Sequence, residues 1–263
     1  MDCFRGVLKT NEYSPRTLAL TLDVIHANPA NYTVWNFRRR VLEALGADLH
    51  EELRFTADMA IQNPKNYQIW HHRREICALL QDGSQEKSFS AQAIQGDSKN
   101  YHAWAHRQWA IRAFDLWADE LDYVDQLLLQ DVRNNSAWNH RWFVLSHTAG
   151  LATAPDRQRE VDYSLAKIAL AVHNESPWNF LRGLVRGHEA SCAAQIKEKA
   201  RQVLKDTPDC IFAASMLVDL YAKEGSEDAL AEAAKLLETL MNHTDRVRKA
   251  YWQFRLTTLK RRE

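Results

Sequence analysis

The sequence predicts an all-α protein, a stack of antiparallel helix hairpins that share one continuous core. The first observation is a motif that recurs five times, around Trp35, Trp70, Trp104, Trp138 and Trp178. The tryptophans are 35, 34, 34 and 40 residues apart, a period typical of stacked units that bury their apolar faces on one another. The second observation is that only 8 Gly and 6 Pro occur among 263 residues, which favours helix.

The expected helices follow the motif in order along the chain. Residues 1–10 are expected to end a helix, and Ser14 and Pro15 provide an N-cap and first residue for the next. Short breaks, several of them at proline or glycine, separate the partners of each later pair. Five pairs are expected at 17–26 and 31–45, 51–62 and 66–80, 86–95 and 100–114, 118–130 and 134–147, and 157–172 and 176–187. Further pairs at 194–205 and 211–223, and at 227–241 and 246–262, bring the total to about seven in a single repeat domain, 1–263.

An asparagine stands four residues before each motif tryptophan, at Asn31, Asn66, Asn100, Asn134 and Asn174. Asparagine is a preferred N-cap because its side-chain oxygen accepts a hydrogen bond from an amide of the first turn, worth about 1 kcal/mol. The tryptophan then lies one turn into the helix, where it is expected to pack against the neighbouring hairpin.

Three histidines occupy the same repeat position, at His72, His106 and His140, each followed by an arginine. A shared metal is not expected, because equivalent positions on stacked hairpins lie on the order of 10 Å apart. Zinc ligands must all lie about 2 Å from one ion. The pattern therefore predicts a hydrogen-bonded His/Arg ladder between repeats, with no metal-ligating residue in this chain.

The position before the cap is Ala30, Lys65, Lys99, Arg133 and His173 in the five repeats. Lys65, Lys99 and Arg133 are therefore expected to form a row of cations beside helix N-termini. Tyr32, Tyr67 and Tyr101 form a second row at the first helical position. Cations, tyrosines and helix N-termini on one edge suit a phosphate that carries an apolar tail. The alternative is a solvated edge whose charges are balanced by the nearby Asp97 and Asp131.

Composition excludes several classes of partner and compartment. The formal net charge is zero, from 34 basic and 34 acidic residues, so no global field attracts nucleic acid or anionic membrane. The four cysteines show no zinc-ligand spacing, and reduced, partly buried thiols are expected. No signal peptide or long apolar run occurs, which predicts a cytoplasmic protein without stable membrane insertion.

Several stretches closely resemble the α subunit shared by protein farnesyltransferase and type I protein geranylgeranyltransferase. They are the PxNYxxWxxRR and KNYxAWxHRQW motifs, the run from Leu116 to Asn139, the stretch from His173 to Asn179, and Arg248 to Trp252. The resemblance covers nearly the whole chain. It implies an α-α superhelix, a right-handed and crescent-shaped array of hairpins, wrapped around an α/α-barrel β subunit.

The resemblance also implies an activity, partners and site residues. The heterodimer would transfer a farnesyl or geranylgeranyl group from its diphosphate to the cysteine of a C-terminal CaaX motif. Zinc would be bound by the β subunit and not by this chain, and magnesium would accompany the diphosphate. Lys99, in the KNY motif, is expected to contact the diphosphate as the catalytic residue. The expected substrate-binding residues are Tyr101, His102, Tyr67, Asn134, Arg133 and Lys65.

Two other functions remain open on the sequence alone. One is a tetratricopeptide-like scaffold without catalysis, which the 34-residue period permits but the N-x3-W-x2-R motif does not favour. The other is an α-repeat protein that never meets a β subunit. The family usually carries a longer proline-rich stretch before the first helix, so the N-terminus is expected to be a shortened one.

Overall fold

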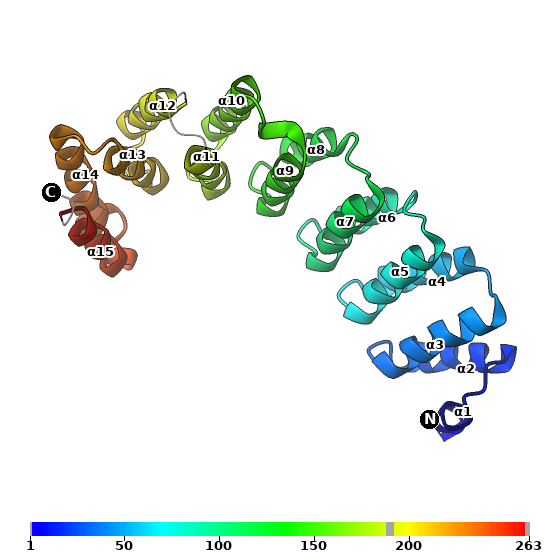
Figure 1. Cartoon of the computed structure of the whole chain (residues 1–263). Coiled ribbons are helices and arrows are strands. Elements are labelled where there is room, and N and C mark those ends of the chain that lie inside the picture. Colours follow the sequence, from blue (N-terminus) through cyan, green and yellow to red (C-terminus); the bar gives the residue numbers. More distant parts are fainter. Residues whose placement is uncertain (1, 188–191, 261–263) are drawn as a thin grey trace. The chain divides into compact units, whose positions relative to one another are not determined.

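The computed structural model describes residues 2–187 and 192–260, and every regular element within those ranges is a helix. The chain divides into two compact units, Met1–Ala118 and Asp119–Glu263. Figure 1 colours the first from blue to green and the second from green to red. The all-α prediction is confirmed. The expectation that residues 1–263 form one domain stays a prediction.

The first unit contains three helix pairs preceded by a single helix, α1 (Asp2–Thr10). In each pair the two helices pack side by side, and the second helices α3, α5 and α7 also contact one another in sequence (Figure 1). The pairs are α2 (Pro15–Ala27) with α3 (Tyr32–Leu45), α4 (Leu49–Gln62) with α5 (Tyr67–Leu80), and α6 (Glu86–Gly96) with α7 (Tyr101–Phe114).

The second unit contains four pairs built in the same way, with α9, α11 and α13 in successive contact. The pairs are α8 (Glu120–Gln130) with α9 (Asn135–His147), α10 (Ala154–Leu170) with α11 (Glu175–Gly187), α12 (Ala193–Asp206) with α13 (Ile211–Glu224), and α14 (Glu227–Thr239) with α15 (Lys249–Lys260). Short helical turns η1 (Ala149–Leu151), η2 (Leu240–Thr244) and η3 (Arg246–Arg248) join some of them. The described residues thus form the seven pairs predicted.

Several predicted boundaries differ from the structure by two or three residues, and those of α10 and of the last pair have a local reason. Helix α10 begins at Ala154 and not near residue 157, because Thr153 and Asp156 form a reciprocal capping box. In the last pair, the first helix does not extend to residue 241 and the second does not begin at residue 246. Helix α14 ends at Thr239, and a π-helical turn with a short 3-10 turn leads into α15.

The five motif tryptophans are core residues with 0 to 6% of their surface exposed, as predicted. Each indole N–H donates to the backbone carbonyl six residues earlier, at 2.8 to 3.0 Å. Each ring is therefore buried against its neighbours while its one polar atom is satisfied by the loop that precedes its own helix. This bond fixes the direction in which the chain enters the second helix of a pair.

Buried glutamates join one repeat to the next. Glu52 on α4 accepts two hydrogen bonds from Arg38 on α3, at 2.8 and 2.7 Å, and lies 2.7 Å from Nε2 of His72 on α5. Glu86 on α6 makes the same contacts with Arg73 on α5 and His106 on α7. All six residues are at most 7% exposed.

The second unit repeats this arrangement with one change. His140 Nε2 lies 2.8 Å from Glu120, and Arg141 forms a bidentate pair with Glu160 at 2.7 and 2.8 Å. Phe180 takes the histidine position in the next pair and packs on Trp138. The predicted ladder between repeats therefore exists, but its arginines and histidines bond to buried glutamates, which were not predicted. Glu52 and Glu86 each lie between an arginine and a histidine.

His72 and His106 are held neutral in the ladder. Burial lowers the pKa of His72 and His106, and the facing glutamate only partly opposes this. Burial raises the pKa of Glu86, but hydrogen bonds from His106 and Arg73 outweigh it and lower the value to about 2. A neutral imidazole that donates from Nε2 leaves Nδ1 as an acceptor. Nδ1 of His106 is buried without a hydrogen-bond partner, which agrees with that tautomer.

We expect Trp104→Ala to lower the free energy of unfolding by about 3–5 kcal/mol, because it leaves a large cavity and frees the carbonyl of Ser98. Trp104→Phe, which keeps most of the ring volume but removes the indole N–H, should cost less. Urea denaturation followed by circular dichroism measures both. Equal, small losses from the two variants would contradict a core role for this side chain.

We also expect the free energy of unfolding to fall as the pH is lowered below about 6.5. The unfolded chain binds protons at histidines that the folded protein keeps neutral, so stability is complete above the unfolded pKa and is lost below it. A second decline should begin near pH 4.5, because the folded pKa of Glu86 is about 2. Urea midpoints measured between pH 7.5 and 4 test this.

The control is His106→Phe, which introduces the residue that Phe37 and Phe180 supply at the same repeat position. This variant should show a shallower decline between pH 6.5 and 5 than the unchanged protein. A stability that is flat from pH 7.5 to 4 in both proteins would show that the buried ladder does not titrate on unfolding.

Candidate functional site

The candidate site of the first unit is built on the loops that join the helices of each pair. These loops are four residues long in the first six pairs, and each ends on the cap residue. The four predicted asparagine caps of α3, α5, α7 and α9 are confirmed by side-chain bonds to first-turn amides. Asn174 makes the corresponding bond, of 3.3 Å, to the amide of Ser176.

Asn100 has a second contact that ties its repeat to the one before. Its Oδ1 accepts hydrogen bonds from the amides of His102 and Ala103, while its Nδ2 donates to the carbonyl of Pro64 at 3.0 Å. Asn174 Nδ2 makes the same bond to Val132, at 2.8 Å. An ionised aspartate could cap a helix but has no N–H to donate in this way, so the second bond requires the amide of asparagine and not a carboxylate.

Two lysines of the first unit, Lys65 and Lys99, lie at these loops and are exposed. The Lys65 ammonium is 3.8 Å from Asp97 in a solvent-exposed ion pair, which is worth little in stability. The Lys99 amide donates to Asp97 Oδ1 at 3.1 Å, and its ammonium has no carboxylate within 4.0 Å among the described residues. Both cations are therefore available to an anion at this edge.

The rings of Tyr67, Tyr101 and His102 form a cluster beside the Lys65 loop. Tyr67 and Tyr101, at the first positions of α5 and α7, are 63% and 75% exposed, and both contact the ring of His102. His102 also lies parallel to Trp70, with ring centroids 6.5 Å apart. Burial lowers the pKa of His102, a hydrogen bond to the backbone of Lys65 opposes that shift, and nearby Arg74 adds to it. His102 is therefore neutral near pH 7.

Arg74 is a cation of this edge that the sequence analysis missed. Its Nη2 donates to the carbonyl of Ala105 at 2.8 Å, and its guanidinium lies over the Trp109 ring. Burial lowers the pKa of Arg74, and the phenols of Tyr67 and Tyr101 oppose the shift. The signal was present, since this position is the second arginine of the WxxRR motif. Only its buried neighbour Arg73 had been assigned a role, in the ladder.

The structure brings together five predicted site residues, Lys65, Tyr67, Lys99, Tyr101 and His102, on the two loops and helix starts of the first unit. Arg133 and Asn134 belong to the second unit. Arg133 is exposed, and its amide donates to Asp131 Oδ1 at 2.9 Å. Asn134 is 2% exposed and caps α9. The roles of all seven residues in substrate binding stay predictions.

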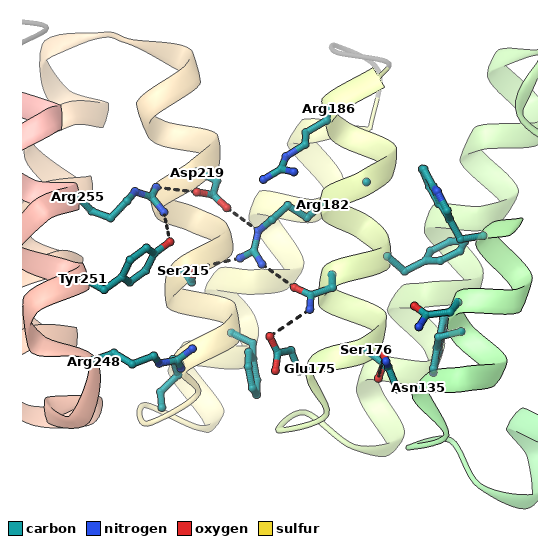
Figure 2. A pocket seen from close by; sticks show the side chains of 18 of the residues that line it. Asn135, Glu175, Ser176, Arg182, Arg186, Ser215, Asp219, Arg248, Tyr251 and Arg255 are labelled. Atoms are coloured by element: carbon teal, nitrogen blue, oxygen red, sulfur yellow. Dashed lines mark hydrogen bonds and ion pairs between the residues drawn. The ribbon is translucent and has the colours of Figure 1, made fainter. Parts of the chain in front are cut away.

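The second unit contains a groove of about 890 Å³ between the second helices of its pairs. Figure 2 shows arginine side chains from α11 and the C-terminal segment that converge on it. This groove was not predicted from the sequence, because part of its wall comes from α13 and the C-terminal segment, which lie beyond the fifth motif. Among the described residues no cluster of three or more His, Cys, Asp or Glu could hold a metal ion. No described helix has the length and apolar character needed to cross a bilayer.

Comparison with known proteins agrees with this architecture. The protein family described as "Protein prenyltransferase alpha subunit repeat" matches residues 15–45, 49–80, 84–114 and 117–148. A solved structure, Candida albicans protein geranylgeranyltransferase-I complexed with GGPP, matches with a TM-score of 0.89 and 30% identity. The match covers 98% of this chain and 88% of that one. The predicted α-α superhelix class is confirmed by this match.

Two relatives carry the name protein farnesyltransferase/geranylgeranyltransferase type-1 subunit alpha. The Solanum lycopersicum protein is 41% identical over 278 residues, which cover 97% of this chain and 80% of that protein. The Dictyostelium discoideum protein is 36% identical over 271 residues, 98% of this chain and 83% of that protein. The chain therefore belongs to the family of protein farnesyltransferase/geranylgeranyltransferase type-1 alpha subunits.

Proposed function

We propose that this chain is the α subunit of a heterodimeric protein prenyltransferase. Together with a β subunit, it would transfer a farnesyl or geranylgeranyl group to the cysteine of a C-terminal CaaX motif. The observation that carries the proposal is the likeness to named α subunits along nearly the whole chain, at 36 to 41% identity. The exposed edge of lysines and tyrosines in the first unit supports it, because it suits a diphosphate with an apolar tail.

The reaction makes a carbon–sulfur bond as the carbon–oxygen bond to the diphosphate breaks. Negative charge grows on the leaving group during this step, so a fixed cation there stabilises the transition state more than the ground state. Lys99 is the proposed contact, since its ammonium has no carboxylate partner among the described residues. Lys65 is the alternative contact. His102 forms a hydrogen bond with the backbone of Lys65, and the rings of Tyr67 and Tyr101 both contact the His102 ring.

The remaining residues of the edge would hold the substrate. Tyr67 and Tyr101 offer exposed rings to an isoprenoid chain, and a neutral His102 can donate a hydrogen bond without adding charge. Zinc bound by the β subunit would activate the attacking thiolate. The described residues of this chain offer no suitable ligand set for that ion. Magnesium at the diphosphate stays a prediction.

We expect the purified chain alone to show no prenyl transfer and to aggregate, because it would expose a surface meant for its partner. Coexpression with the β subunit of the same organism should yield a heterodimer that prenylates a CaaX peptide. Size-exclusion chromatography and a fluorescent-peptide assay test both points. A soluble monomer that forms no complex would favour a scaffold protein, and robust transfer by the monomer would overturn the assignment.

We expect Lys99→Ala in the heterodimer to lower the single-turnover rate on the order of 10²-fold, as removal of one preorganised charge contact does. Lys65→Ala should cost much less. Heterodimer yield and zinc content should not change in either variant, since both side chains are exposed at loops.

The control is Lys9→Ala, which removes an exposed lysine from α1. The reverse order of effects would move the contact to Lys65, one repeat earlier. Small and equal losses from all three variants would show that the lysines only form a solvated edge.

A further inference from the structure

Side-chain contacts line the facing sides of α5 and α7, and they begin at the edge of lysines and tyrosines. The two helices pack side by side in the first unit (Figure 1). At the edge, the ring centroids of Tyr67 and His102 are 6.0 Å apart. One turn further along α5, Trp70 lies nearly parallel to the same His102 ring. Both contacts place the start of α7 relative to the start of α5.

Arg74 makes the next contact of this interface. It is seven residues after Tyr67, which is two turns along the same side of α5. Its Nη2 donates to the carbonyl of Ala105 at 2.8 Å, and its guanidinium lies 5.4 Å from the centre of the Trp109 ring. Ala105 follows His102 by three residues, on the same side of α7. Arg74 therefore fixes α7 one turn beyond the ring that contacts Tyr67.

The counterpart of Arg74 in the preceding pair makes a different contact. Arg39 has this position on α3, and its Nη1 lies 3.4 Å from Nδ1 of the ladder histidine His72. The corresponding bond is not formed one repeat later. Nδ1 of His106 and Nε of Arg74 are both buried without a hydrogen-bond partner among the described residues. An unsatisfied acceptor of this kind costs stability, so the bond of Arg74 to α7 replaces one that would have favoured the ladder.

The charge of Arg74 is also less well compensated than that of Arg39. Burial lowers the pKa of both arginines. At Arg39 the nearby carboxylate of Glu75 opposes this shift. At Arg74 the phenols of Tyr67 and Tyr101 oppose it, and Arg74 forms no salt bridge with a residue that the structure describes. A methionine could occupy the same position without the cost of a half-buried charge, so the bond that the arginine donates accounts for its presence.

We propose that Arg74 is a positioning residue for prenyl transfer. Its bond to Ala105 holds His102 against Tyr67, so that the edge is already formed when the isoprenoid diphosphate arrives. Its role is to hold the binding residues and not to bind the substrate. The inference rests on the proposed function, because the edge is taken to bind that diphosphate. A preformed edge lowers the cost of ordering on binding, so loss of Arg74 should weaken substrate binding more than it slows the chemical step.

The test compares Arg74→Met with Arg74→Lys in the heterodimer formed with the β subunit of the same organism. Methionine keeps an apolar stem beside Trp109 and removes every donor, whereas lysine keeps the charge and one donor group. Arg74→Met should raise the KM for the isoprenoid diphosphate about 10-fold and leave kcat within about twofold, because contacts that are equally strong in the ground and transition states change KM alone. Arg74→Lys should recover most of the loss. Steady-state prenylation of a CaaX peptide measures both constants.

The matched control is Arg39→Met, which removes the same side chain from the preceding pair, where it contacts the ladder. This variant should leave the KM for the diphosphate within about twofold. Thermal unfolding of each heterodimer compares how far the two substitutions disturb folding. An equal rise in KM for Arg39→Met and Arg74→Met would mean that Arg74 only stabilises the repeat, and would overturn the inference.

A double-mutant cycle tests whether Arg74 acts through His102. In a chain that already carries His102→Ala, Arg74→Met should raise the KM less than about threefold, because the ring that Arg74 holds in place has been removed. Effects of the two substitutions that multiply fully would contradict the inference. A loss confined to kcat would also contradict it, since that pattern belongs to a contact made only in the transition state.

The outcomes separate the inference from the proposed function. If the unchanged chain forms no heterodimer, or the heterodimer transfers no prenyl group, the proposed function fails and the inference falls with it. If the unchanged heterodimer is active and Arg74→Met has the same KM, the function stands and Arg74 is not a positioning residue.

Discussion

A buried carboxylate held between an arginine and a histidine is the contact on which the repeat structure depends. Glu52 and Glu86 each lie on the first helix of one pair and bind the arginine of the pair before. A charge at this depth is tolerated only when it is fully bonded, and loss of one member typically costs about 3–5 kcal/mol. The geometry also demands one spacing between pairs, because a bidentate contact does not stretch. The lysine and tyrosine edge is repeated at a regular interval for the same reason.

The tryptophans, the asparagine caps and the exposed tyrosines could be predicted, because each type recurs at one position of the motif. The glutamates have the same period, at Glu52, Glu86, Glu120 and Glu160, and were missed. A single glutamate in a helix usually occupies a solvent-exposed position, and nothing in the neighbouring sequence indicates that these glutamates are buried. The second function of Asn100, as a donor to the previous loop, was equally invisible, since an N-cap alone accounts for the residue.

The residues of the candidate sites also differ in whether the repeat motif makes their positions predictable. Lys65 and Lys99 could be placed at one edge because their positions are defined by the cap. Arg74 belongs to the motif, but its place at this edge could not be predicted, because its proximity to Tyr67 and Tyr101 depends on how α5 and α7 pack. The groove was out of reach for a further reason. Arg182, Asp219 and Arg255 come from three different pairs, two of them beyond the fifth motif, and only the packing of those helices makes one carboxylate bond to two arginines.

The carbonyls of Pro64 and Val132 each accept two hydrogen bonds, one from the tryptophan that follows and one from the asparagine of the next pair. Both lone pairs of the oxygen are thereby used, so the loop cannot gain or lose a residue without disturbing two repeats. The connections between successive pairs lie at the opposite ends of the hairpins. The longest step, between Trp138 and Trp178, has its additional residues there, around η1 and the start of α10. Insertions and deletions among relatives should accordingly accumulate between pairs and spare the four-residue loops within them, which makes the outer connections the natural places to attach a tag or graft a new segment.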